Sequence, residues 1–169
     1  IEIDLDKSGV RDKVFSNLYL IQYALVMNPR HVSSKQNPML QKAISLHQSG
    51  KLAEAAVLYK KLLNFFPKNT TLLTNLGTIA LQQGNLEECI KLIGKSLEIS
   101  PNQPNAYSNL GVALKELKRL DDALISYDRA IALKPDYADA YSNRGVALKE
   151  LKRLDDALIS YDRAIALKP

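Results

Sequence analysis

The feature that most constrains this chain is a sequence that repeats at a fixed interval of 34 residues. Residues 107–135 and 141–169 are identical except at one position, where Leu110 is replaced by Arg144. A period between roughly 20 and 50 residues is typical of proteins built from stacked structural repeats. The same spacing continues upstream through Pro67, Pro101, Pro135 and Pro169. The sequence therefore predicts four units, at residues 36–69, 70–103, 104–137 and 138–169.

Each unit has the pattern of two helices joined by a short polar turn. In the third unit, large and small apolar residues recur at helical spacing on one face of the first helix: Tyr107, Leu110, Gly111, Leu114 and Leu117. A matching stripe marks the second helix: Ala123, Leu124, Tyr127, Ala130 and Ile131. We expect Gly111 to face Ala123 and Ala130, because small side chains let two helix axes approach closely. A single pair of helices cannot bury both stripes, so the units must stack into an all-α solenoid of antiparallel helix pairs.

The pattern of these residues resembles the tetratricopeptide repeat, and it recurs in register over residues 36–169. The motif "DAYSN" at 139–143, with its asparagine two residues after the tyrosine, is most similar to repeats of O-linked N-acetylglucosamine transferase-type proteins and related bacterial repeat proteins. The resemblance implies a right-handed solenoid in which the first helices line a concave groove. It also implies that the groove binds a protein or peptide partner.

One row of amide side chains falls at the same position of each first helix: Gln41, Asn75, Asn109 and Asn143. Under the resemblance these residues form a ladder along the groove. An amide group offers two donors and an acceptor, so it can bond the backbone of an extended peptide whatever its side chains are. The alternative is that the amides bond neighbouring helices and bind no ligand. The predicted peptide-binding groove also includes Thr78, Val112, Lys115, Val146 and Lys149.

A different kind of groove occurs elsewhere in the family, where lysines and arginines from several first helices converge on the carboxylate of a chaperone tail. Here the relevant positions hold Leu40, Ile44, Thr74 and Asn105. None of these side chains is cationic. The sequence therefore argues against a heat-shock chaperone adaptor.

The residues contain no pattern that points to catalysis. His31 and His47 have no cysteine or carboxylate cluster at metal-ligand spacing, and no glycine-rich phosphate loop is present. Cys89 occupies the slot of Ala123 in the next unit, which predicts a buried, inert thiol. We therefore expect no enzymatic activity, no catalytic residue, no metal site and no cofactor.

Composition indicates the compartment of the protein and excludes some classes of partner. The net charge of +5 is mild, and the positive charges of "KELKR" at 115–119 are balanced locally by carboxylates, which argues against nucleic acid. The apolar run at 14–27 is shorter than the roughly 20 residues that a membrane span requires. The single cysteine favours a reducing compartment. We expect a cytoplasmic protein with no nucleic-acid or membrane partner.

Residues 1–35 do not follow the repeat register and are predicted to form a divergent helix and a linker. The helix, at about 11–27, is apolar nearly all round and must be covered. The stripe of the last unit also needs a partner, because terminal repeats usually carry a polar outer face. One hypothesis is that the helix caps the first repeat of its own chain. The other is head-to-tail self-association through Phe15, Leu18, Ile21, Leu158, Tyr161 and Ile165.

These observations favour a protein–protein interaction module that binds an extended peptide in the groove. The first alternative is a self-associating repeat scaffold, hence a homo-oligomer. The second is that these repeats are the tetratricopeptide part of a larger protein glycosyltransferase.

Overall fold

The computed structural model describes residues 37–168, and within this range the regular elements are helices, with no strand. The predicted helix at 11–27, with Phe15, Leu18 and Ile21, lies outside the described residues, so its packing stays a prediction. The helices are α2 (Pro38–Gln48), α3 (Leu52–Phe65), α4 (Thr70–Gln82), α5 (Leu86–Ile99), α6 (Pro104–Glu116), α7 (Leu120–Leu133), α8 (Ala138–Glu150) and α9 (Leu154–Leu167).

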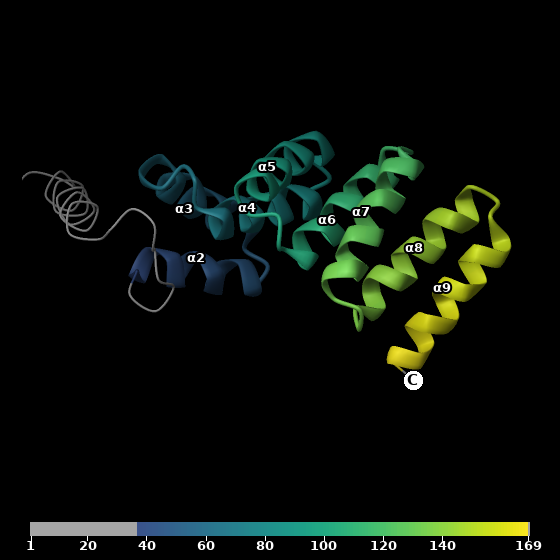
Figure 1. The fold of residues 1–169 in the computed structure, drawn as a ribbon. Helices are drawn as coiled ribbons and strands as arrows, with labels where there is room; N and C mark the ends of the chain where they lie inside the picture. The colour runs from purple at the N-terminus through teal and green to yellow at the C-terminus, as the bar shows by residue number, and fades with distance from the viewer. Residues whose placement is uncertain (1–36, 169) are drawn as a thin grey trace, which may run out of the picture.

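The helices follow one another in space in the order of the sequence (Figure 1). The closest packing joins α4 to α5, α6 to α7 and α8 to α9, and the second helix of each pair then packs on the first helix of the next. The chain is an all-α, right-handed solenoid of antiparallel helix pairs, as the sequence predicts. Below, α2, α4, α6 and α8 are called the first helices, and α3, α5, α7 and α9 the second helices.

Short polar signals set the helix ends. The side-chain oxygens of Asn37 and Asn69 accept hydrogen bonds of 3.0 Å from the backbone N–H of Leu40 and Leu72, which caps α2 and α4. The turn inside each unit needs one residue with positive φ. Gly50 and Gly84 supply it in the first two units, and Lys118 (φ 60) and Lys152 (φ 59) in the last two. Each lysine pays about 1 kcal/mol for this conformation, because its Cβ crowds the backbone there.

Two of the small residues on the first helices, Gly111 and Gly145, admit a tyrosine ring, where the sequence suggested an alanine. A Cβ atom added to Gly111 would lie 2.5 Å from Cε1 of Tyr127, so its nearest neighbour is this tyrosine rather than Ala123 or Ala130. Gly145 repeats the arrangement with Tyr161. Tyr127 is fully buried between the third and fourth units, and Tyr161 is half-buried. The glycine therefore makes room for the largest side chain of the core.

Candidate functional site

Three of the first helices, α4, α6 and α8, contact one another in succession, whereas successive second helices do not approach one another as closely. Layers that come closer on one side curve toward that side, so the first helices lie on the inside of the curve. We call this surface the first-helix face. All the residues predicted for the groove belong to first helices: Gln41, Asn75, Thr78, Asn109, Val112, Lys115, Asn143, Val146 and Lys149.

Two amides of the predicted ladder are bonded to neighbouring helices. The side chain of Asn75 donates through Nδ2 to the hydroxyl of Tyr59 on α3 at 3.3 Å. Asn109 donates through Nδ2 to the hydroxyl of Thr78 on α4 at 2.9 Å. Each of these bonds uses one N–H of the amide, and both side chains stay half-exposed. The second N–H and the carbonyl oxygen of each amide are thus left for a ligand.

Asn143 differs from these two. The residue that stands to Asn143 as Thr78 stands to Asn109 is Val112, which has no acceptor. Among the described residues Asn143 has no hydrogen-bond partner, although it is half-buried. It is the ladder amide whose donors and acceptor are all unused inside the array. Gln41, on α2, is exposed.

The charged groups at the end of the first helices are paired unevenly. Lys115 contacts Glu116 at 2.7 Å, and this hydrogen bond together with the charge of Lys115 lowers the pKa of the Glu116 carboxyl. Lys118 reaches Glu150 of the next unit at 2.8 Å. Lys149, the counterpart of Lys115, is exposed and has no ion pair within the described part of the chain. Lys149, which lies six residues after Asn143 on α8, is therefore a cation that remains for an acidic group of a ligand.

One buried polar atom near this surface was not anticipated. The hydroxyl of Tyr127 is fully buried and has no hydrogen-bond partner in the described structure. Burial raises the pKa of this phenol, and the negative charges of Glu116 and Glu150 raise it further. Its counterpart Tyr59 accepts the bond from Asn75, and Asn143 is the residue that would make the same bond to Tyr127. The same separation of 16 residues in both pairs would predict a bond between Asn143 and Tyr127, but the structure does not contain it.

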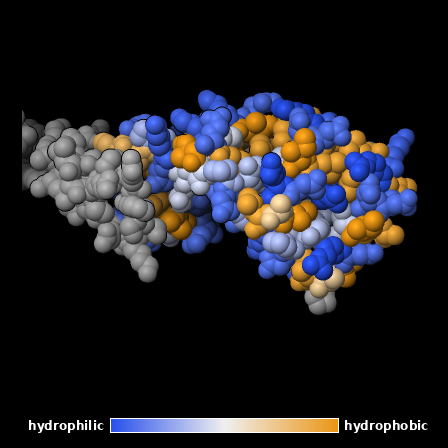
Figure 2. Space-filling model, in the orientation of Figure 1, coloured by the Kyte–Doolittle hydropathy of each residue, from blue (hydrophilic) through white to orange (hydrophobic). Residues whose placement is uncertain are grey.

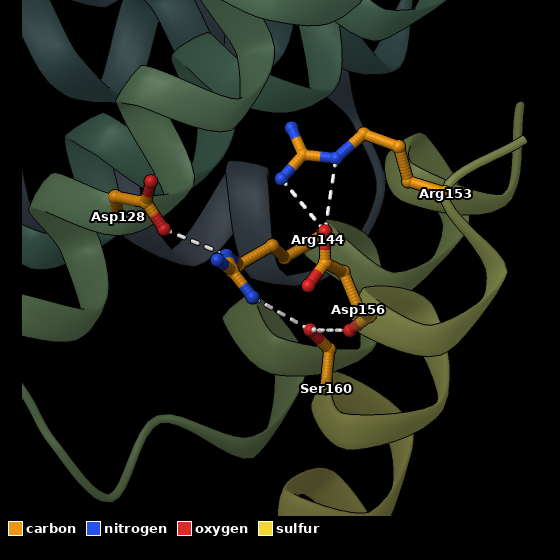
Figure 3. Close-up of polar contacts among 5 residues, drawn as sticks. All are labelled: Asp128, Arg144, Arg153, Asp156 and Ser160. Atoms are coloured by element: carbon orange, nitrogen blue, oxygen red, sulfur yellow. Dashed lines mark hydrogen bonds and ion pairs between the residues drawn. The ribbon is translucent and has the colours of Figure 1, made fainter. Parts of the chain in front are cut away.

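A second feature missed from sequence is the environment of Arg144. Its Nε donates to Oδ1 of Asp128 on α7 at 2.6 Å, and its Nη1 donates to the hydroxyl of Ser160 on α9 at 2.7 Å (Figure 3). Arg144 thus joins two successive second helices. The counterpart of Asp128 one period earlier is Gly94, opposite the apolar Leu110. The replacement of Leu110 by Arg144 in the fourth unit therefore coincides with the replacement of Gly94 by Asp128 on the preceding second helix.

The described residues contain few other groups that could bind a metal ion or react. No group of three or more His, Cys, Asp or Glu side chains between residues 37 and 168 is arranged to hold a metal ion. Cys89 is buried, and burial raises the pKa of its thiol to about 11. None of the described helices is long and apolar enough to cross a membrane.

Comparison with known proteins gives consistent matches. Two family models, each described as tetratricopeptide repeat, match residues 69–136 and 108–169. No curated protein matches the sequence. The MamA protein of one crystal structure shares 28% sequence identity with this chain, with a TM-score of 0.71. The match covers 78% of this chain and 72% of that one.

Two further structures bear on function. The first tetratricopeptide repeat of Spaghetti (RPAP3), bound to an HSP90 peptide, is 31% identical with a TM-score of 0.58, over 59% of this chain and 79% of that one. An O-GlcNAc transferase from Thermobaculum terrenum is 26% identical with a TM-score of 0.63, over 65% of this chain. The match covers only 21% of that transferase.

Proposed function

Because this chain belongs to the tetratricopeptide repeat family, we propose that it is a protein–protein interaction module that binds an extended peptide along its first-helix face. The observation that carries the proposal is the row of half-exposed amides, above all Asn143, which has no partner inside the described array. A buried or half-buried amide without partners costs free energy, and a ligand backbone would satisfy it. The proposal makes this chain a binding protein without catalytic chemistry.

The geometry suits an extended segment of low sequence specificity. Layers of helices stand about 10 Å apart, and an extended peptide rises about 3.3 Å per residue. Successive ladder amides would therefore meet every third residue of the peptide. The neighbours of the amides are small or apolar, such as Val112 and Val146, so they leave room for varied side chains. Lys149 would favour an acidic residue near the end of the peptide bound by the last unit.

The ligand of the similar Spaghetti structure is not carried over to this chain. An acidic chaperone tail needs several cations converging from the first helices. At the positions concerned this chain has Leu40, Ile44, Thr74 and Asn105, and Leu40 is buried. We infer that the preferred peptide is not a chaperone tail.

The test is selection of ligands from a library of displayed random peptides on the immobilised chain, followed by affinity measurement with single variants. Asn143→Ala should weaken binding of a selected peptide about tenfold, since it removes a pair of hydrogen bonds to the backbone. Alanine at Asn75, Asn109 and Asn143 together should abolish measurable binding. The matched control is Asn64→Ala, an exposed asparagine on the second helix α3.

Thermal unfolding of each variant separates lost binding from lost stability. Asn143→Ala should leave stability unchanged or raise it, because this side chain makes no bond in the described structure and alanine is the better helix former. Selected peptides that bind the triple variant with unchanged affinity would place the site elsewhere. A library that yields no ligand would contradict peptide binding altogether.

A further inference from the structure

Helix α7 exposes a large apolar side chain to solvent in the interior of the array. Ile125 is 63% exposed, although both α6 and α8 pack on α7. The same residue of α9, Ile159, is 65% exposed, so the presence of a following unit makes no difference at this position. In Figure 2, orange patches lie among blue hydrophilic residues over the part of the molecule where Figure 1 places α7 and α9. The exposure of Ile125 therefore comes from the side of the second helix on which it lies.

Ile125 stands between two charged residues of opposite sign. Asp121 precedes it by four residues and Arg129 follows it by four. Residues four apart are neighbours on the surface of a helix, so the three side chains form one line. Both charged residues are exposed, and neither has an ion pair within residues 37–168. Their charges are therefore available to a partner.

We call this line of three residues the outward stripe of α7. Helices α7 and α9 share all 14 residues, LDDALISYDRAIAL. Helix α9 therefore carries a second outward stripe with the same side chains, which are likewise exposed and, for the two charged ones, without an ion pair among the described residues: Asp155, Ile159 and Arg163.

The outward stripe is complementary to an antiparallel copy of itself. A twofold axis through the isoleucine, perpendicular to the helix, exchanges the residue four positions before it with the residue four positions after it. This holds because the two residues lie at the same rise, about 6 Å, and the same rotation, about 40°, on opposite sides of the isoleucine. The aspartate of one stripe then lies opposite the arginine of the other, and the two isoleucines meet between the two ion pairs. Two stripes with the same charge at both ends would instead repel each other.

The stripes of the other second helices lack this property. On α3 the residue that corresponds to Asp121 is Ala53, so that stripe has no carboxylate. On α5 the residue that corresponds to Ile125 is Lys91, which would lie opposite the same lysine of a second α5. Among the described second helices, only α7 and α9 combine an acid, an exposed isoleucine and an arginine at this spacing.

We propose that the outward stripes of α7 and α9 bind the same stripes of a second copy of this chain, with α7 of one copy antiparallel to α9 of the other. This arrangement engages both stripes of each copy around one twofold axis. Burial of the isoleucines supplies the favourable free energy. The ion pairs fix the antiparallel orientation, since reversing one helix would bring like charges together. The contact is isologous, so it closes at a dimer.

This surface lies on the second helices, so it is independent of peptide binding on the first-helix face. It also differs from the sequence-based hypothesis of head-to-tail association, in which Leu158, Tyr161 and Ile165 take part. A head-to-tail contact is heterologous and continues into rings or filaments, whereas the twofold contact stops at two copies. The mass of the assembly therefore separates the two hypotheses.

The first experiment measures the molar mass of the 169-residue chain by light scattering over a concentration series. We expect the parent to approach twice the mass of one chain and not to exceed it. Ile125→Lys should raise the dissociation constant at least tenfold, because it puts a cation into the apolar centre of the contact. Ile125→Lys combined with Ile159→Lys should leave only monomer. Both isoleucines are exposed, so no core packing is lost, and circular dichroism checks the helix content.

The matched control is Ser142→Lys, which adds the same charge at an exposed residue of the first helix α8. It should leave the dissociation constant unchanged. A parent that stays monomeric, a mass that grows beyond the dimer, or an equal effect of Ser142→Lys would overturn the proposal.

The second experiment tests whether the stripes meet each other. One variant reverses the cations, Arg129→Asp with Arg163→Asp, and a second reverses the acids, Asp121→Arg with Asp155→Arg. Each variant alone should associate at least tenfold more weakly than the parent, because like charges then face each other at both ends of each stripe. An equimolar mixture of the two variants, and a chain with all four substitutions, should associate like the parent, because opposite charges then meet again. If the reversed variants associate like the parent, or if neither the mixture nor the fourfold chain recovers, the stripes do not bind each other and the proposal fails.

Discussion

The guanidinium of Arg144 on α8 lies 2.6 Å from the carboxylate of Asp128 on α7, at the position where the two otherwise identical stretches of the third and fourth units differ. Both partners are partly exposed, so the pair is screened by solvent. Such pairs contribute about 0–1 kcal/mol. The pair therefore acts more on which helix follows which than on total stability, since an arginine opposite Gly94 would find no carboxylate there.

Exchanging the one residue that differs between the two units should change the free energy of unfolding by unequal amounts. Arg144→Leu should change the free energy of unfolding by less than about 1 kcal/mol. Leu110→Arg should cost about 1–3 kcal/mol, because it brings an unpaired cation against the buried cluster that contains Cys89 and Ile93. Adding Gly94→Asp to Leu110→Arg should recover part of the loss, and an added Cβ at Gly94 meets no atom within 4 Å. Urea denaturation of the three variants and the parent decides this, and equal losses for the two single exchanges would contradict it.

The two packed glycines provide a matched pair. An alanine at Gly111 would meet the fully buried ring of Tyr127, and one at Gly145 would meet Tyr161 at 2.7 Å, where the ring is half-buried and has room to move. Both substitutions gain about 1 kcal/mol of helix propensity. Overpacking offsets this gain by about 1–3 kcal/mol at Gly111. Thermal unfolding should therefore show Gly111→Ala less stable than Gly145→Ala, and the reverse order would contradict the packing argument.

The two tyrosines of the same position should respond differently to loss of the hydroxyl. Tyr59→Phe removes the acceptor of the bond from Asn75 and should cost about 0.5–1.5 kcal/mol. Tyr127→Phe removes a buried hydroxyl without a partner and should leave stability unchanged or raise it. Chemical denaturation measures both differences against the parent chain. A loss at Tyr127 as large as the loss at Tyr59 would mean that the hydroxyl is bonded in solution.

Stability should fall at alkaline pH through Cys89. Burial raises the pKa of this thiol to about 11, while the thiol of an unfolded chain titrates at about 8.5. Below pH 8.5 both states keep the proton, and the full contribution is present. Between pH 8.5 and 11 the unfolded state loses its proton first, so the free energy of unfolding decreases by roughly 3 kcal/mol.

The control for this titration is Cys89→Ala, because alanine fills the same slot and is buried at positions 55, 123 and 157. The difference in unfolding free energy between the parent and this variant, followed from pH 8 to 11, isolates the thiol from the tyrosines and lysines. A difference that stays constant over this range would show that the thiol titrates normally in the folded chain. Slow modification of the folded parent by a thiol reagent is expected as well.

Much of the fold followed from the sequence because the information is periodic and local. The spacing of Pro67, Pro101 and Pro135 marks the end of three of the units, and the helical stripes between these prolines predict the helices that the structure contains. The turn residues were also predictable, since Gly50 and Gly84 mark the positions where Lys118 and Lys152 take positive φ. Each of these signals acts within a few residues of the chain.

The candidate site was predictable only in outline. The register placed the four amides on one face, and the structure agrees on the helices that carry them. Their partners could not be predicted, because the bond of Asn109 depends on Thr78 in another unit, and the residue in the same register for Asn143 is Val112. The unpaired hydroxyl of Tyr127 and the ring that fills the space beside Gly111 likewise depend on contacts between separate helices.

The sequence by itself determined the number of helices in the repeats, their order and the small positions that let them pack, because each unit repeats the same local preferences. Only the tertiary structure decided which residues are buried and which polar groups are satisfied. Helices α7 and α9 make the reason plain: their sequences are identical, yet Leu124 is covered and Leu158 is exposed. Whether a residue is buried or paired depends on the residues around it, and these are determined by how the units stack.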